Sequence, residues 1–365
     1  MDRRVFLKAG LGVSASTFVA GLPRPRGVSA APTAEGKWRT FEVTTRAEVA
    51  DAGGITRVWL PLGLMPQTEY FKNLGQTWTG NAEATRIYRD EKYGAAIFYA
   101  EWPKGVAAPA IEVTSTFATR DRAVDLSTSG ERAREDKRTL AKYLAATRLI
   151  KTDGIVREKA VEITKGAGGE TEKARAIYEW IVDNTFRDPK VRGCGIGDIG
   201  WMLESGNLGG KCADLNALFV GLARAVGIPA RDLYGVRAAD SAEFKALGKS
   251  GDISKAQHCR AEFYAAAHGW VPVDPADVRK VVLEEPPGNL PVNDPKVLRA
   301  RKKLFGAWEM NYLAFNYAHD VKLPNSESEP IAFFMYPQAE SNGERRDSLD
   351  PDSFRYRMTS RELTV

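Results

Sequence analysis

Alternating apolar and polar positions mark the first part of the chain as strand-forming. The segment Trp38-Arg-Thr-Phe-Glu-Val-Thr-Thr alternates strictly, and the segments that begin at Thr56, Ala95 and Ile111 are rich in β-branched and aromatic residues. Clusters of Gly, Asn and Pro separate these segments, as the turns of an antiparallel sheet require. We therefore predict that residues 31–127 form a β-rich, sandwich-like domain. No nucleophile, base and acid cluster there, so we expect it to serve in packing or recognition.

The pattern changes to helical spacing near residue 128. Apolar residues then recur at three- and four-residue intervals in three segments, at 135–146, 155–166 and 171–184. After a further helix, the chain returns to short alternating runs. We predict a mixed helix-and-strand domain at 128–285 and a C-terminal extension with short strands at 286–365, where Pro, Asn and aromatic residues are frequent.

The first 30 residues differ from the rest of the chain. They begin Met-Asp-Arg-Arg-Val-Phe-Leu-Lys, continue with an apolar run from Ala9 to Leu22, and end in Val28-Ser29-Ala30. This order of charged, apolar and small-residue regions resembles a twin-arginine export signal with its cleavage site. We expect the mature protein to be periplasmic or secreted, with no stable membrane anchor after cleavage. The alternative is the basic, amphipathic N-terminus of a cytosolic protein.

Charge and residue counts narrow the classes of function. The net charge of the 365 residues is +5, but beyond residue 30 there are 47 basic and 46 acidic residues. A nearly neutral body argues against nucleic-acid binding through bulk electrostatics. Three cysteines cannot form a disulfide scaffold, and three histidines make a multi-histidine metal site improbable. The glycine-rich stretch 193–200 lacks the Lys-Ser/Thr of a nucleotide loop, and no calcium-binding loop occurs, so we expect no cofactor and no metal.

One cysteine occupies a position suited to nucleophilic chemistry. Cys212 follows Gly209-Gly210-Lys211 and precedes an apolar helix that ends near Gly227 and Pro229. A helix N-terminus stabilises a thiolate, and its free N–H groups can hold a developing oxyanion. We expect the backbone N–H of Cys212 to serve this purpose, with Asn207 as a second candidate donor. Cys212 could instead be a small buried core residue.

Two later segments supply a base and an acid. The run Gln257-His258-Cys-Arg-Ala-Glu-Phe-Tyr alternates as a strand, and Gly269-Trp-Val-Pro-Val-Asp274-Pro is predicted to be its hairpin partner. The hairpin can bring His258 beside Asp274, so that His258 activates Cys212 and Asp274 orients the imidazole. The alternatives are a structural histidine and a turn-initiating aspartate.

These motifs, together with Gly-Gly-Lys-Cys-Ala-Asp and Gly-Ile-Pro-Ala-Arg, resemble the transglutaminase-like superfamily over roughly residues 170–280. The resemblance implies an α+β, papain-like core in which a helix that carries the cysteine packs on an antiparallel sheet. It also implies that Cys212, His258 and Asp274 form a catalytic triad.

Several further residues receive weaker predictions. Arg260 stands where many relatives have an aromatic residue, and it shares a strand face with His258, so it is a candidate neighbour of the substrate. An arginine that pairs with a structural carboxylate is an equal alternative. Trp201 is a second candidate neighbour. We expect Asp214 to cap the helix of Cys212, and Arg231 is its candidate partner.

The function we expect is that of an exported, cysteine-dependent enzyme that cleaves an amide bond through a thioester on Cys212. Hydrolysis of a peptide or isopeptide bond is favoured over transfer to an amine because the predicted surroundings are polar. A non-catalytic module that binds peptides is the alternative of a different class. The substrate is a peptide or protein, and cell-envelope molecules are among the candidates. We expect the polar loop 238–256 to border the site, and Cys194 and Cys259 to be either bonded or buried.

Overall fold

The computed structural model describes residues 36–64, 66–127 and 135–364. The predicted export signal lies outside these residues. Within them, no helix combines the length and the apolar character that a membrane crossing would need.

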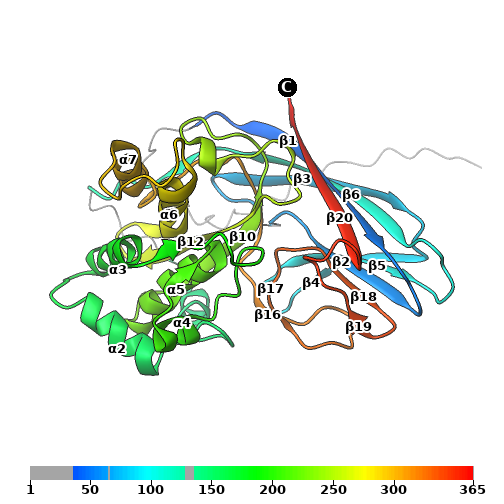
Figure 1. The fold of residues 1–365 in the computed structure, drawn as a ribbon, viewed down its shortest axis with the longest axis horizontal. Coiled ribbons are helices and arrows are strands. Elements are labelled where there is room, and N and C mark those ends of the chain that lie inside the picture. The colour runs from blue at the N-terminus through cyan, green and yellow to red at the C-terminus, as the bar shows by residue number, and fades with distance from the viewer. Residues whose placement is uncertain (1–35, 65, 128–134, 365) are drawn as a thin grey trace, which may run out of the picture.

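Two five-stranded antiparallel sheets form a β-sandwich, which lies on the right of Figure 1. One sheet has the order β11 (Gly251–Asp252), β20 (Phe354–Leu363), β1 (Arg39–Val49), β6 (Ala110–Thr119) and β3 (Phe71–Gly80). The other has the order β19 (Glu344–Arg345), β18 (Gln338–Ser341), β2 (Thr56–Pro61), β5 (Ala96–Trp102) and β4 (Ala84–Arg89). Inward side chains such as Val49, Leu60, Phe98, Trp102 and Val113 form the core between the sheets. The alternation seen in the sequence therefore marks the buried faces.

Strands from the end of the chain complete both sheets. β20 pairs with β1 in antiparallel register from Thr40↔Leu363 to Val49↔Phe354, and β18 pairs with β2. The division of the chain at 31–127, 128–285 and 286–365 stays a prediction. The last of these segments nevertheless contributes strands to both sheets of the sandwich and is not a separate layer.

The catalytic region predicted from sequence is built on a four-stranded antiparallel sheet of order β13 (Gly269–Val273), β12 (Gln257–Ala265), β10 (Ala230–Arg237) and β15 (Tyr312–Asn316). Helix α5 (Cys212–Ala225) packs on β12 and β10, and every residue of this helix is buried. Its Phe219 contacts Phe263 of β12. This is the α+β core expected from the sequence, with the cysteine-bearing helix on an antiparallel sheet.

Shorter elements surround this core. The remaining helices are α1 (Lys137–Lys142), α2 (Gly154–Ile163), α3 (Glu170–Asn184), α4 (Ile199–Ser205), α6 (Pro275–Glu284), α7 (Pro295–Lys303) and the 3₁₀ turn η1 (Lys245–Leu247). The remaining strands are β7 (Arg122–Ala123), β8 (Phe186–Arg187), β9 (Gly209–Gly210), β14 (Ala307–Trp308), β16 (His319–Val321) and β17 (Ile331–Phe333). Figure 1 shows the helices gathered on the side of β10 and β12 away from the sandwich.

A buried ion cluster joins the segment that follows β6 to the four-stranded sheet. Glu262 of β12 is fully buried and binds both Arg122 of β7 and Arg231 of β10, the latter over 2.6 Å. The Arg231 guanidinium also lies 3.9 Å from the ring centroids of Trp270 and Tyr317. The expected pairing of Arg231 with Asp214 is therefore wrong, because β10 and β12 are neighbours and place Arg231 directly opposite Glu262.

Candidate active site

Helix α5 begins at Cys212, so the thiol lies at a helix N-terminus as expected. Asp214 caps the helix in the predicted manner. Its Oδ2 accepts a hydrogen bond from the backbone N–H of Lys211 over 2.9 Å, and its Oδ1 accepts from Ile196 and Gly197, each over 2.9 Å. The dipole of α5 thus acts on the thiol, and the loop that carries Ile196 is fixed against the first helical turn.

Two glycines permit this close approach. A Cβ atom at Gly195 would lie 1.8 Å from Oδ2 of Asp214, and one at Gly210 would lie 2.5 Å from its Cβ. Gly195 also has a φ of +93°, which side chains rarely adopt. The glycine-rich stretch that resembled a nucleotide loop therefore serves to wrap the start of the cysteine helix.

His258 and Asp274 lie side by side, as the hairpin of β12 and β13 predicts. Nε2 of His258 lies 2.7 Å from Oδ2 of Asp274, and both side chains are buried. The backbone N–H of Asp277 donates to the other carboxylate oxygen, Oδ1, over 3.0 Å, so Asp274 caps α6. The Asp-Pro pair thus starts a helix and at the same time holds the imidazole.

Asn216 links the thiol helix to this carboxylate. It lies one turn after Cys212 on α5 and is fully buried. Its Nδ2 donates to Oδ1 of Asp274 over 3.1 Å and to the carbonyl of Cys259 over 2.8 Å. Its Oδ1 accepts from the N–H of Ala276 over 3.3 Å. One side chain therefore fixes α5, β12 and the start of α6 relative to one another.

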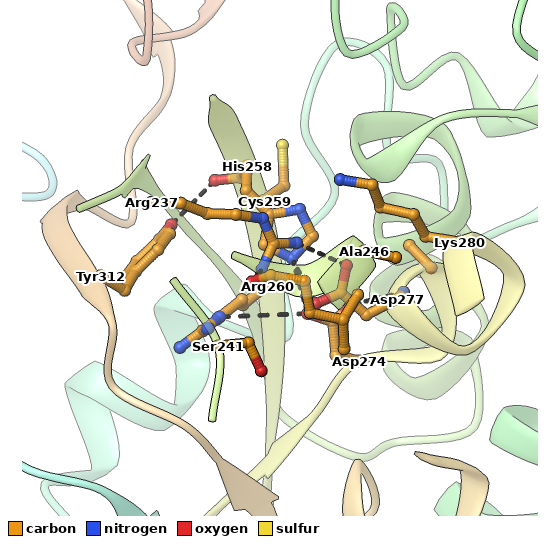
Figure 2. Close-up of polar contacts among 12 residues, drawn as sticks. Arg237, Ser241, Ala246, His258, Cys259, Arg260, Asp274, Asp277, Lys280 and Tyr312 are labelled. Atoms are coloured by element: carbon orange, nitrogen blue, oxygen red, sulfur yellow. Dashed lines mark hydrogen bonds and ion pairs between the residues drawn. The ribbon is translucent and has the colours of Figure 1, made fainter. Parts of the chain in front are cut away.

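A second carboxylate faces His258. Oδ2 of Asp277 lies 3.3 Å from Nε2 of His258, and Oδ1 of Asp277 accepts from Arg237 over 2.6 Å. Figure 2 shows Arg237, Asp274 and Asp277 converging on the imidazole. His258, Asp274 and Asp277 have the residue types of a metal site, and their ligand atoms lie within 4.8 Å of one another. Arg237 already neutralises Asp277, so the arrangement suits a protonated His258 better than a divalent cation.

The charges favour a thiolate and an imidazolium. Burial and the Arg237 charge oppose protonation of His258, but Asp277 and Asp274 outweigh them and raise the pKa of His258 to about 9. Hydrogen bonds from Cys194 and Cys259, and then the hydrogen bond and charge of His258, hold the pKa of Cys212 well below its usual value in spite of burial. An ion pair of this kind is the reactive form of a thiol nucleophile.

All three cysteines are reduced and buried. Cys194 lies against the first turn of α5, since its carbonyl accepts from the N–H of Ala213 over 2.9 Å. Its Sγ faces the carbonyl of Gln257 at 3.3 Å. Cys259 lies on the face of β12 opposite His258, as the alternation predicts, and Figure 2 shows its sulfur pointing away from the imidazole. We expected Cys194 and Cys259 to be either bonded to each other or buried, and the structure shows them unbonded and buried.

The C-terminal part of the chain covers the cysteines. Met335 is fully buried, with its Sδ 3.8 Å from Sγ of Cys259. Burial, and then the charge of Cys194 and a hydrogen bond with it, raise the pKa of Tyr336 well above its usual value. Cys212 itself is only 4% exposed. Met335 and Tyr336, in the segment after β17, thus lie against Cys259 and Cys194.

The loop 238–256 borders the site on the side of His258. Arg237 donates to the carbonyl of Leu247 in this loop over 2.5 Å, and the same guanidinium binds Asp277. Arg237 belongs to the strand face of His258, because Gly235 pairs with His258 in register. The loop therefore meets the imidazole side of the site.

The weaker candidates are placed as follows. Arg260 is buried, and its Nε lies 4.0 Å from Oδ2 of Asp274. Its Nη2 donates to the carbonyl of Glu309 over 2.9 Å. Trp201 is 54% exposed on α4. Asn207 is exposed, and its Oδ1 accepts from the N–H of Gly209 over 3.1 Å, so its carbonyl oxygen braces the turn before the thiol. The buried position of Arg260 favours the alternative of a structural partner.

Sequence reasoning missed Asn216, Asp277 and Arg237. A signal existed for Asn216, which is a polar residue at i+4 from Cys212 on an otherwise apolar helix face. A weaker sequence signal existed for Asp277, which follows Asp274 by one helical turn. No such signal existed for Arg237 at the end of β10, because its partner, Asp277, is brought to it only by the packing of α6.

Comparison with known proteins agrees with this geometry. The family model described as the transglutaminase-like superfamily matches residues 157–275, a range that contains Cys212, His258 and Asp274. An uncharacterized protein of Haemophilus influenzae is 39% identical over 326 residues, which cover 85% of this chain and 87% of the relative. Among solved structures, a candidate cysteine protease from Cytophaga hutchinsonii is similar with a TM-score of 0.57 and 14% identity over 91% of this chain and 93% of that one. The periplasmic domain of TgpA from Pseudomonas aeruginosa has a TM-score of 0.34 and 14% identity over 69% and 93% of the two chains.

Proposed function

This chain belongs to the transglutaminase-like superfamily, and we propose that it is a cysteine-dependent enzyme that cleaves an amide bond of a peptide or protein. The observation that carries the proposal is the 2.7 Å contact of His258 with Asp274, which Asn216 ties to the helix that begins at the thiol of Cys212. The lowered pKa of Cys212 and the raised pKa of His258 support a reactive ion pair. Neither feature is needed by a module that only binds a peptide.

The first half of the proposed reaction forms a thioester. The thiolate of Cys212 attacks the amide carbon, and the electron pair of the C=O bond moves to oxygen. The backbone N–H of Cys212 can stabilise this oxyanion at the helix N-terminus. The imidazolium of His258 then gives its proton to the amide nitrogen, the C–N bond breaks, and an amine leaves.

The second half releases the acyl group. His258 is now neutral and takes a proton from water, whose oxygen attacks the thioester carbon. The C–S bond breaks, a carboxylic acid leaves, and the thiolate–imidazolium pair is restored. Asp274 accepts a hydrogen bond from Nε2 throughout, so the other ring nitrogen, Nδ1, exchanges the proton.

One observation favours a second candidate, transfer of the acyl group to an amine. Cys212 is only 4% exposed and is enclosed by the segment that contains Tyr336, and shelter from water helps an amine to compete. Hydrolysis is still our first proposal, because the His258 side of the site is lined by ionic groups rather than by an apolar entry.

A labelling and turnover experiment tests the proposal. An electrophilic thiol probe is expected to label one cysteine per native chain, at Cys212, and Cys194 and Cys259 only after unfolding. Cleavage of a fluorogenic peptide-amide library, with and without millimolar primary amine, then separates hydrolysis from transfer by the product formed. Loss of labelling and of both products in Cys212→Ala supports the enzyme. An unlabelled native protein would support the peptide-binding module instead.

We also propose that the protein acts in the periplasm or outside the cell, on peptides or proteins of the cell envelope. Support comes from Arg3-Arg4 and the apolar run that follows. Cell fractionation tests the export step. Replacement of both arginines by lysine should leave the protein in the cytoplasm, whereas unchanged export would contradict a twin-arginine route.

A further inference from the structure

We propose that Asp277 and Arg237 are positioning residues of this site, which form a second clamp on His258 beside the one made by Asp274. The proposal rests on the proposed function only for its effect on activity. The clamp itself is a property of the folded protein and can be measured without a substrate.

The geometry gives Nε2 of His258 two carboxylate neighbours. Oδ2 of Asp274 lies 2.7 Å away and Oδ2 of Asp277 lies 3.3 Å away. Nη2 of Arg237 lies 2.6 Å from Oδ1 of Asp277, so that one oxygen of this carboxylate faces a guanidinium and the other faces the imidazole. The exposed fractions of these side chains are all 4% or less. Contacts this deeply buried are only weakly screened by solvent.

Local structure places the two carboxylates together. Asp274 caps α6, and Asp277 stands in its first turn, where a three-residue spacing puts both on the same helix face. Arg237 ends β10, and its other amino group, Nη1, is held by the carbonyl of Leu247. Each member of the clamp therefore has a fixed backbone support and a second partner.

Charge balance explains why two buried carboxylates are tolerated. Burial alone would raise the pKa of Asp277, but the charges of Arg237 and His258 hold it far below its usual value, so Asp277 stays ionised. Arg260 supports Asp274 from 4.0 Å. With the thiolate of Cys212 and the imidazolium, the six charges sum to zero. The cluster is therefore fully ionised but has no net charge. In this state His258 stays protonated until it donates the proton to the leaving amine.

The groups that face His258 come from five elements. They are Cys212 of α5, Arg237 of β10, Arg260 of β12, Tyr312 of β15, and Asp274 and Asp277 at the start of α6. Lys280 of α6 acts one step away, through Asp277. Since Arg237 and Asp277 act on the imidazole with opposite sign, their replacements must shift its titration in opposite directions.

The test is an NMR titration of the imidazole, which is practicable because the chain has only three histidines. In Asp277→Asn, the pKa of His258 should fall by about one unit or more, because a carboxylate is lost and Arg237 is left unpaired beside the ring. In Arg237→Gln, the pKa should rise. Glu284→Gln removes an exposed carboxylate from the same helix and is the matched control, for which no shift is expected. His268 and His319 serve as internal references.

Activity gives the second readout. The pH at which kcat/KM falls should be lower in Asp277→Asn and higher in Arg237→Gln. If the two residues had a purely structural role, kcat/KM would be lower in both variants, and this pH would not shift in opposite directions. An unchanged His258 titration in folded Asp277→Asn would overturn the clamp. If that variant does not fold, Arg237→Gln decides: an upward shift supports the clamp and no shift overturns it. Opposite titration shifts in a protein that cleaves no amide would leave the clamp standing and remove the proposed function.

Discussion

The Asn216 side chain donates to Oδ1 of Asp274 over 3.1 Å, which ties the helix of the thiol to the carboxylate that orients the base. Asn216 and Cys212 are one helical turn apart, and Asp274 lies 58 residues beyond Asn216. The relative position of nucleophile and base therefore depends on a hydrogen bond between two residues that are not themselves expected to react.

Replacing Asn216 by Ala should lower kcat/KM for amide cleavage by about 10- to 100-fold, since a hydrogen bond to a charged group contributes roughly 1.5–3 kcal/mol. Asn184→Ala is the matched control, because this exposed amide bonds only the carbonyl of Trp180 within its own helix. Equal rates for Asn216→Ala and the control would show that Asp274 is held without the amide.

Amide cleavage should be lost at high pH as His258 gives up its proton. The carboxylates raise the pKa of this imidazole to about 9, so the ion pair persists below that pH and disappears above it. A profile of kcat/KM against pH should thus fall with a midpoint near 9. A fall near 6.5, the ordinary value for histidine, would mean that the clamped imidazolium does not operate in the enzyme.

Replacement of Cys194 by Ala should move the low-pH limit of thiol reactivity upward. Interaction with the Cys194 thiol is the largest of the influences that lower the pKa of Cys212. The rate of alkylation of Cys212 by iodoacetamide, followed across pH, measures this directly. Cys194→Ser keeps a donor and should shift the limit less, so identical profiles for both variants would contradict the hydrogen bond.

Glu262→Gln should lower the free energy of unfolding by about 3–5 kcal/mol, because it leaves the buried Arg231 without a counter-charge and Arg122 with only the exposed Glu69. Chemical denaturation gives the value. The exposed pair of Arg39 and Glu362 offers a comparison, and Glu362→Ala should cost no more than about 1 kcal/mol. Similar losses in the two variants would show that the buried Glu262 cluster contributes no more to stability than an exposed ion pair.

The arrangement of Cys212, His258 and Asp274 on their elements could be predicted from sequence because it depends on short-range order. Helical spacing after Cys212 located the helix start, and alternation in the strand of His258 put Cys259 on the opposite face. The hairpin that brings Asp274 to His258 spans only sixteen residues. Each of these inferences needs a pattern of fewer than twenty residues, and the structure contains all three.

The remainder depends on contacts between distant segments. Arg231 could be given a partner only by knowing that β10 lies beside β12, which places Glu262 opposite it. Tyr336 reaches the thiols from more than one hundred residues away in sequence. Buried polar residues such as Asp277 and Arg237 look like surface residues in a linear pattern, because their burial depends on mutual neutralisation rather than on apolar character.

The pairing of β20 with β1 has a consequence for the order of folding. These strands lie about three hundred residues apart, and β1 also pairs with β6. During synthesis on the ribosome, the edge of β1 that pairs with β20 stays unpaired until residues 354–363 have been made. The open edge is a site for wrong pairing between nascent chains, and the high contact order predicts slow closure of this sheet. The sandwich should therefore be the last part of the molecule to fold, after the helix of Cys212 has packed on β10 and β12.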